Sequence, residues 1–405
     1  MIKFQTAAAL AILSLPLLSQ AAGPAASRLN ASADNTDTVG FNPAGMTRLE
    51  GRQFGAEVIL IKSWSKFDVD ENRTTVDGGS PRDSDPEMLP LINYSHQLDD
   101  RWFAGVALNV PSGFGASNGP NWAGRYYTDS FSLVYVGLTP SLAYKMTDKL
   151  SVSAGIQVMY ADSSIKTRIN NDPFNTEVGD GRLKGDSDGV GLGYTVSALY
   201  EFTEFTRVGL VYRSEVDPEL DTTLDFRNAV RPPGIIDGLQ GETINLDDRV
   251  PQIIAAGLFH QFDNQLEVTV DTIWTEFSKF GVTEIHLHGN DINVPESDYN
   301  DFFTITAGVS WPLNETMKAS VGALWLEQPI DDDVRGFGIT LDEIWGIGAG
   351  INFARENGDD FDVNVSLLDT GSAPIDTEFH PIKGRVAGEF EDPYVLAIDF
   401  SYHWR

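Results

Sequence analysis

Three side chains able to bind divalent metals lie two residues apart at Glu284, His286 and His288. In an extended segment this spacing places all three on one face, where carboxylate and imidazole groups could hold an ion. The neighbouring residues belong to a long polar connector, in which histidines are usually solvated. Oxygen ligands for calcium are grouped at 186–188 and 331–333, but neither run has a complete calcium-loop pattern. We therefore predict no metal site and no cofactor.

Nucleophilic catalysis needs a serine and a histidine whose side chains meet. Ser95 and His96 are adjacent, so in a strand they point to opposite faces. Ser401 and His403 share a face, but no third partner is evident. The chain has no GxxxxGK[ST] phosphate loop. We predict that the protein is not an enzyme.

The balance of charge excludes one class of partner. The 405 residues include 28 Lys and Arg against 59 Asp and Glu, and the formal net charge is -31. A chain this acidic is not expected to bind nucleic acid through a basic surface. Cysteine is absent, which excludes disulfides and thiolate metal sites.

The N-terminus has the three parts of an export signal. Lys3 precedes an apolar run from Ala7 to Leu18, and small residues follow up to Ala21. Because the apolar run is shorter than the roughly 20 residues of a membrane-spanning helix, we assign residues 1–21 to a cleaved signal peptide. No later apolar run approaches that length, so the exported chain is soluble or spans an outer membrane with strands.

The elements that must position the polar side chains are strands, because apolar and polar residues alternate along much of the chain. From Leu150 to Tyr160 every second residue is apolar, which indicates a strand between two different environments. Fourteen such segments are predicted, at 52–66, 87–98, 101–111, 131–146, 149–167, 189–202, 206–216, 249–262, 264–277, 301–312, 315–326, 343–354, 360–370 and 393–404.

The connectors between these segments alternate in length. Short ones such as 99–100 and 147–148 are followed by long ones such as 112–130 and 168–188. Bacterial outer-membrane barrels have an even number of strands, short periplasmic turns and long external loops, whereas a soluble sandwich gives no reason for this alternation. We predict an all-β fold, in which residues 51–405 form a 14-stranded antiparallel transmembrane β-barrel in the outer membrane of a Gram-negative bacterium.

Aromatic residues near the predicted strand ends are typical of the girdles at membrane interfaces. Examples are Trp64, Trp345, Trp404 and the pair Tyr126–Tyr127.

Residues 22–50 precede the first strand and do not alternate; most are small or polar. A barrel this wide has an aqueous lumen unless something fills it, so we predict that this segment is a lumen plug, or hatch. Within it, Asn42, Pro43 and Ala44 suit a compact turn, because the Asn side chain can bond the local backbone and proline fixes φ. The alternative is a periplasmic linker with an ordinary turn.

The sequence resembles the FadL family of outer-membrane transporters of long-chain fatty acids. The resemblance rests on Asn42–Ala44, on the Tyr-Arg-Ser-Glu-Val run at 212–216, on Ala-Gly at the signal-peptide end and on the fourteen strands. It implies an N-terminal hatch and diffusion of hydrophobic molecules through a lateral opening beside an inward kink of the third strand. This chain departs from the family in having Pro24 after Ala-Gly and in having Arg405 after Trp404.

The segment that matches the kink contains Pro111, Ser112, Gly113, Phe114 and Gly115. Proline cannot donate a hydrogen bond to a neighbouring strand, and the two glycines disfavour regular pairing. We therefore predict that pairing fails after the preceding residue and that the wall opens there. The alternative is that the strand ends and an external loop begins.

Arg213 alternates with the outward position 212, so its side chain is expected in the lumen. A guanidinium there could bind a substrate carboxylate through two hydrogen bonds, or it could pair with Glu215 or another lumen acid.

These features together predict a passive channel that captures a long-chain fatty acid or a similar hydrophobic molecule and releases it sideways. The expected partners are that substrate, outer-membrane lipid and lipopolysaccharide, and the barrel is expected to be a monomer. The alternative is a porin for small polar solutes, because lumen positions such as Glu267, Asp271, Asp362 and Asp399 are polar.

Overall fold

The computed structural model describes residues 30–81, 86–173, 177–230, 240–287, 290–294 and 298–405. The predicted signal peptide and the first residues of the predicted hatch lie outside this part of the chain. No helix among the described residues is long and apolar enough to cross a membrane.

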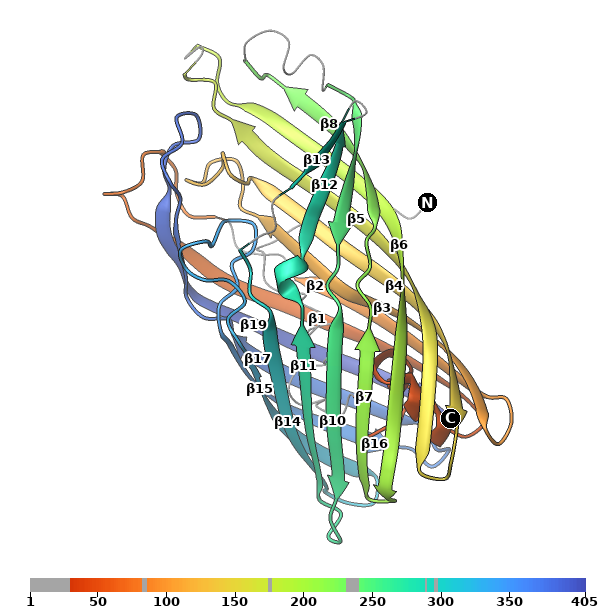
Figure 1. Cartoon of the computed structure of the whole chain (residues 1–405). Helices are drawn as coiled ribbons and strands as arrows, with labels where there is room; N and C mark the ends of the chain where they lie inside the picture. Colours follow the sequence, from red (N-terminus) through yellow and green to blue (C-terminus); the bar gives the residue numbers. More distant parts are fainter. Residues whose placement is uncertain (1–29, 82–85, 174–176, 231–239, 288–289, 295–297) are drawn as a thin grey trace.

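Fourteen long strands of the described chain form one antiparallel sheet that closes on itself (Figure 1), since the first strand pairs with both the second and the last. The prediction of a 14-stranded barrel is confirmed. The strands are β1 (Arg52–Val69), β2 (Glu87–Gln97), β3 (Trp102–Ser117), β4 (Ser130–Lys145), β5 (Leu150–Ile169), β6 (Gly181–Thr203), β7 (Thr206–Arg213), β10 (Ile253–Gln261), β11 (Glu267–Thr275), β14 (Phe302–Pro312), β15 (Met317–Leu326), β16 (Ile344–Ala354), β17 (Asp360–Asp369) and β19 (Ala387–Trp404).

Five further strands lengthen the sheet at the end opposite the short turns, at the top of Figure 1. They are β8 (Glu219–Arg227), β9 (Thr243–Arg249), β12 (Gly281–Leu287), β13 (Asn290–Asn293) and β18 (Ala373–Asp376). The sequence assigned them to loops, which is wrong. β6 begins at Gly181 instead of residue 189, and the early half of β6 is paired on both sides, by β5 and β8. This pairing satisfies backbone groups that would otherwise form a free sheet edge.

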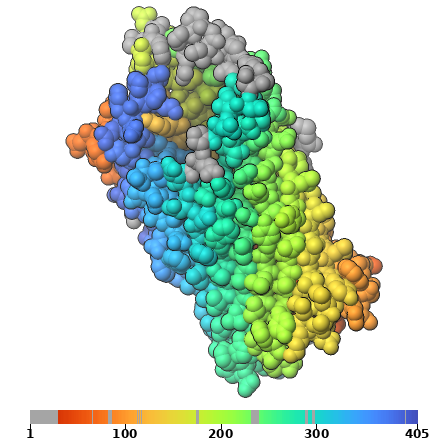
Figure 2. All heavy atoms as spheres, viewed as in Figure 1, coloured from red at the N-terminus to blue at the C-terminus, as the bar shows by residue number. Residues whose placement is uncertain are grey.

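The outer face of the barrel is apolar, as alternation requires. On β5 the side chains of Ile156 and Tyr160 are 59% and 42% exposed, while those of Gln157 and Met159, which lie between them in sequence, are buried. Every long strand of this wall contributes similar outward residues, and Figure 2 shows the surface from β7 to β14 as closely packed atoms. Such a surface is stable against the hydrocarbon of a membrane and not against water.

The inward face changes character along the barrel axis. On β19 the buried inward residues are Val395 and Ala397, then Asp399, Ser401 and His403 toward the short-turn end. The same order holds on most strands, so an apolar belt lies above a polar half of the lumen. The apolar belt consists of Ile59, Ile61, Leu91, Tyr135, Met159, Val211, Ile253, Ile273, Phe302, Leu324, Ile344, Leu368 and Val395.

Three short helical segments complete the described chain: α1 (Thr38–Phe41), η2 (Pro43–Arg48) and η3 (Phe277–Lys279). α1 and η2 lie inside the polar half, against β2, β3, β4, β5 and β6.

Candidate functional site

The described part of the N-terminal segment is held inside the barrel by buried hydrogen bonds. The Nδ2 group of Asn42 donates to the carbonyl oxygens of Asn30 at 2.7 Å and Ala198 at 3.2 Å. Its Oδ1 accepts from the backbone N–H of Ala44 at 3.2 Å and caps η2, whose first residue is Pro43. The predicted turn is therefore present, and its asparagine also bonds the barrel wall at β6.

Two glycines allow the segment to approach the wall closely. A Cβ atom on Gly209 would lie 1.7 Å from the carbonyl oxygen of Asn30, and one on Gly105 would lie 2.4 Å from the sulfur of Met46. Any side chain at position 209 would clash with the backbone of Asn30, so the N-terminal segment would have to move away from β7.

Arginines from the wall bind the backbone of the same segment. Arg213 donates to the carbonyl oxygens of Gly40 and Phe41, at the C-terminus of α1. Arg207 donates to the carbonyl oxygens of Ala31 at 3.1 Å and Ser32 at 2.7 Å. The structure thus places Arg213 in the lumen, as expected, but against main-chain carbonyls.

Glu215, the partner considered for Arg213, instead lies 3.7 Å from the guanidinium of Arg249. This ion pair belongs to the extended part of the sheet, beyond the end of β7.

Backbone pairing between β2 and β3 covers only the first part of β3. β3 pairs with β2 from Phe103 to Leu108, and no further pair follows among the described residues. On its other side β3 pairs with β4 as far as Asn109, skips two residues, and resumes from Ser112 to Ser117. The strand therefore continues past the predicted boundary at residue 111, and the alternative of a simple strand end is wrong.

The skipped residues, Val110 and Pro111, form a bulge opposite β4. Because proline has no N–H to donate and a bulge bends its strand, this is where β3 leaves β2. Gly113 and Gly115 pair with Val134 and Ser132 of β4, so the predicted failure of pairing occurs on the β2 side alone. For Ser112 and Phe114 only the backbone pairing is described.

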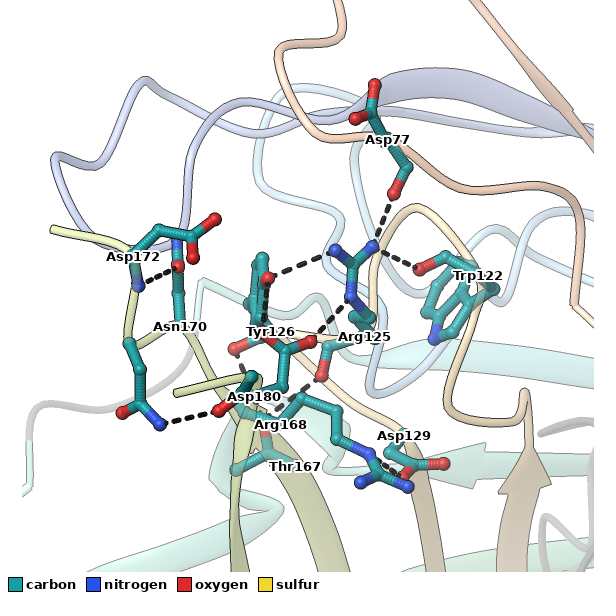
Figure 3. Close-up of polar contacts among 12 residues, drawn as sticks. Asp77, Trp122, Arg125, Tyr126, Asp129, Thr167, Arg168, Asn170, Asp172 and Asp180 are labelled. Carbon is teal, nitrogen blue, oxygen red and sulfur yellow. Dashed lines mark hydrogen bonds and ion pairs between the residues drawn. The ribbon is translucent and has the colours of Figure 1, made fainter. Parts of the chain in front are cut away.

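A polar cluster fixes the connector between β3 and β4 (Figure 3). Arg125 lies 3.1 Å from Asp180, and the hydroxyl group of Tyr126 donates to the same carboxylate at 2.8 Å. Burial and the adjacent Asp180 raise the pKa of Tyr126 to about 12. A second ion pair joins Arg168 to Asp129 at 2.9 Å. The assignment of Tyr126 to an outer aromatic girdle is wrong, because the ring belongs to this cluster.

Beside this cluster the connector contributes an apolar side chain to the mouth of the barrel. Trp122 is 1% exposed and packs edge-on against Phe67 and Phe337. The sequence indicates this contact only by an aromatic-rich run, at 122–127, within a polar connector.

The groups considered for metal binding or catalysis have local partners. His286 lies 2.8 Å from Asp291 and 3.4 Å from Asp247, and hydrogen bonds to these carboxylates, first to Asp291, raise the pKa of the imidazole. His288 lies outside the described residues. Asp332 and Asp186 are paired with Arg335 and Lys184.

Two serines occupy positions that suggest a nucleophile but lack its geometry. Ser187 stands in a Gly-Asp-Ser-Asp-Gly run, yet it lies within regular β6 and its hydroxyl contacts Thr222 at 2.7 Å. A nucleophile elbow requires a sharp turn from strand to helix. The second serine is Ser401, which was predicted to share a face with His403. Both side chains are buried in the lumen, but Nδ1 of His403 lies 2.9 Å from the hydroxyl oxygen of Thr36.

A closed antiparallel barrel with an apolar outer face and a largely polar lumen defines an outer-membrane protein. The chain belongs to the family of outer membrane transport proteins described as OMPP1/FadL/TodX, whose model matches residues 3–404. This family consists of transporters and channels. The predicted family and the predicted outer-membrane location are thus confirmed.

Individual relatives are distant in sequence. The long-chain fatty acid transport protein of Escherichia coli O6:H1 is 22% identical, over 94% of this chain and 91% of the relative. Outer membrane protein P1 of Haemophilus influenzae is 24% identical, over 72% of this chain and 71% of the relative.

Solved structures share the fold. A FadL homologue from Pseudomonas aeruginosa superposes with a TM-score of 0.83 at 18% identity, covering 98% of this chain and 99% of the homologue. The toluene transporter TodX of Pseudomonas putida superposes with a TM-score of 0.65 at 17% identity, covering 91% and 93%.

Proposed function

We propose that this protein is a passive channel that captures hydrophobic molecules in the apolar belt and releases them sideways between β2 and β3 into the outer membrane. One relative named above is a long-chain fatty acid transport protein and another is a toluene transporter, and both kinds of substrate gain free energy on leaving water. Burial of a methylene group contributes about 0.8 kcal/mol, so a sixteen-carbon chain gains roughly 12 kcal/mol gross in an apolar site. Capture therefore needs no energy source.

The segment from residue 22 to residue 50 acts in this proposal as the hatch. Its described part spans the lumen: Asn30 bonds Asp271 on β11 at 2.9 Å, Asn42 bonds Ala198 on β6, and Thr36 contacts His403 on β19. Contacts to strands on different sides of the barrel oppose axial flow, which weighs against the porin alternative. Liposomes containing the protein should not swell in small sugars, whereas a porin would admit them.

The observation that carries the proposal is the end of β2–β3 pairing at Leu108. With the axial route filled, this seam is the path from the apolar belt to lipid. The bulge at Pro111 creates the seam, so restoring strand character should close it.

The test is the triple variant Pro111→Thr, Gly113→Val and Gly115→Thr, which supplies a missing donor and two β-branched residues. Lumen binding of a long-chain fatty acid or an aromatic hydrocarbon should survive, while uptake by cells should fall sharply. Pro140→Thr is the matched control, because Pro140 lies opposite Val106 in the regular part of the β3–β4 ladder. If the triple variant assembles with a closed wall and transports at the original rate, release follows another path.

A further inference from the structure

A cavity of about 280 Å³ lies between the N-terminal segment and the inner wall, near the short-turn end. Its lining comes from the N-terminal segment and from β1, β15, β16, β17 and β19. Six carboxylates line it, namely Asp34, Asp37, Glu57, Asp360, Asp362 and Asp399. The sequence prediction of no metal site did not consider this group, because its members are far apart along the chain.

His403 lies beside three of these carboxylates, those of Asp37, Asp360 and Asp362. Its side chain is 1% exposed, and Nδ1 lies 2.9 Å from the hydroxyl oxygen of Thr36. Nε2 lies 3.2 Å from Nδ2 of Asn35, whose Oδ1 accepts from the N–H of Asp37. That bond fixes the orientation of the amide, so Nδ2 donates and Nε2 accepts. In this arrangement of hydrogen bonds Nδ1 carries a proton and Nε2 is the acceptor.

Three carboxylates surround Nε2, and an ion bound to this nitrogen would replace the hydrogen bond from Asn35. Nε2 lies 3.6 Å from Asp37, 3.7 Å from Asp362 and 4.0 Å from Asp360. These separations are too long for hydrogen bonds. Two ligands at about 2.1 Å from a tetrahedral metal lie roughly 3.4 Å apart, which is close to these three distances from Nε2. One donor atom from each of Asp360, Asp362 and His403 already lies within 4.8 Å of the others.

The negative charge at the cavity exceeds the positive charge that contacts it. Arg405 lies 2.9 Å from Asp360, but Lys318 is directed to Glu267 at 2.7 Å. Asp399 is 1% exposed; its Oδ1 accepts from Asn364, and its Oδ2 has no hydrogen-bond partner among the described residues. Buried carboxylates of this kind are stable only with protons or a cation beside them.

We propose that this cavity binds one divalent transition-metal ion, of the Zn²⁺ or Mn²⁺ kind, through Nε2 of His403 and the carboxylates of Asp37, Asp360 and Asp362. An imidazole with carboxylates favours these ions over calcium, which takes oxygen ligands. Thr36, which accepts from Nδ1–H, holds the imidazole in the tautomer that a metal requires. Because Asp37 belongs to the N-terminal segment and the other ligands belong to β17 and β19, the ion fastens that segment to the wall.

The test uses the full-length exported barrel in detergent, with Mn²⁺ alone as the probe, followed by electron paramagnetic resonance. We expect one Mn²⁺ per chain with a nitrogen coupling from imidazole. Asp362→Asn and His403→Gln should each weaken binding at least tenfold, and Glu284→Gln should leave it unchanged. Glu284 is the matched control, because it belongs to the other cluster of three donor groups, with Asp247 and His286.

Binding should also slow hydrogen exchange of the backbone amides in residues 35–42, and Asp37→Asn should abolish this slowing. The proposal is overturned if Mn²⁺ does not bind at millimolar concentration, if bound Mn²⁺ shows no nitrogen coupling, or if Glu284→Gln removes binding and Asp362→Asn does not. His403→Gln could fail to assemble, since His403 lies in the last strand. In that case the nitrogen coupling of the unmodified protein and the Mn²⁺ affinity of Asp362→Asn still test the proposal.

Discussion

Replacing Asn42 by alanine should release the N-terminal segment from the barrel wall. The Asn42 side chain makes three hydrogen bonds and is 1% exposed. A net contribution of about 1 kcal/mol for each bond gives a loss of about 3 kcal/mol. Since 1.4 kcal/mol is a factor of ten, the undocked population should rise about 100-fold.

Hydrogen exchange read by mass spectrometry measures that population directly. The backbone N–H groups of Asn42 and Gly45 bond to Thr38 and to Asn42 within the docked segment, so their exchange should accelerate about 100-fold. Conductance to small ions in planar bilayers should rise in parallel, because the segment spans the lumen. Deletion of residues 22–50 sets the upper limit of that rise.

Asn245→Ala is the control for this experiment. Asn245 also donates from Nδ2 to an acceptor, Asp221 at 2.6 Å, but it lies on β9 outside the lumen. If Asn42→Ala accelerates exchange less than tenfold, or accelerates it without changing conductance, then these bonds do not hold the segment or the segment does not occlude the channel.

Three further predictions follow from the wall, the lumen and the extended sheet. The purified protein should show a strand-dominated circular dichroism spectrum and change its gel mobility on boiling, because a closed barrel has no free edge; a helical spectrum would contradict the fold. Arg213→Lys should weaken binding of a fatty acid more than binding of toluene if the guanidinium contacts a carboxylate, whereas equal losses would restrict Arg213 to holding Gly40 and Phe41. The imidazole of His286 should titrate above its ordinary pKa of about 6.5 in an NMR titration, so its ion pairs stabilise β12 fully below pH 6.5 and are lost as pH rises through the higher folded value; a pKa below 6.5 would refute this.

Alternation along the chain was sufficient to predict the barrel strands, because lipid on one side and lumen on the other impose a period of two. It did not predict β8 or β12, which extend the sheet: the residues of β12 are all half-buried, and in β8 burial alternates only in the first half, where Leu220 and Thr222 are buried. The outward Tyr212 and inward Arg213 were assigned correctly for the same reason.

The lumen contacts are less predictable. Asn42 meets Ala198, and His403 meets Asp37, only because the sheet curves until the first and last strands pair. No local pattern encodes that closure. The bulge at Pro111 had a local signal, but the side on which pairing would fail depends on the neighbouring strands.

Because the inward face is divided into an apolar belt and a polar half, the free energy of a hydrocarbon inside the barrel depends on its position along the barrel axis. When a hydrocarbon moves from the belt to the polar half, near Glu57, Asp271 and Asp399, its free energy rises by about 0.8 kcal/mol for every methylene group that is exposed to polar surroundings. For ten methylenes this is about 8 kcal/mol, or nearly six powers of ten in equilibrium occupancy. On the proposed lateral route the free energy changes little by comparison, because one hydrocarbon medium replaces another. If release is lateral as proposed, the order of side chains along each strand sets the direction of exit, and the barrel selects its substrate by partition between water and hydrocarbon.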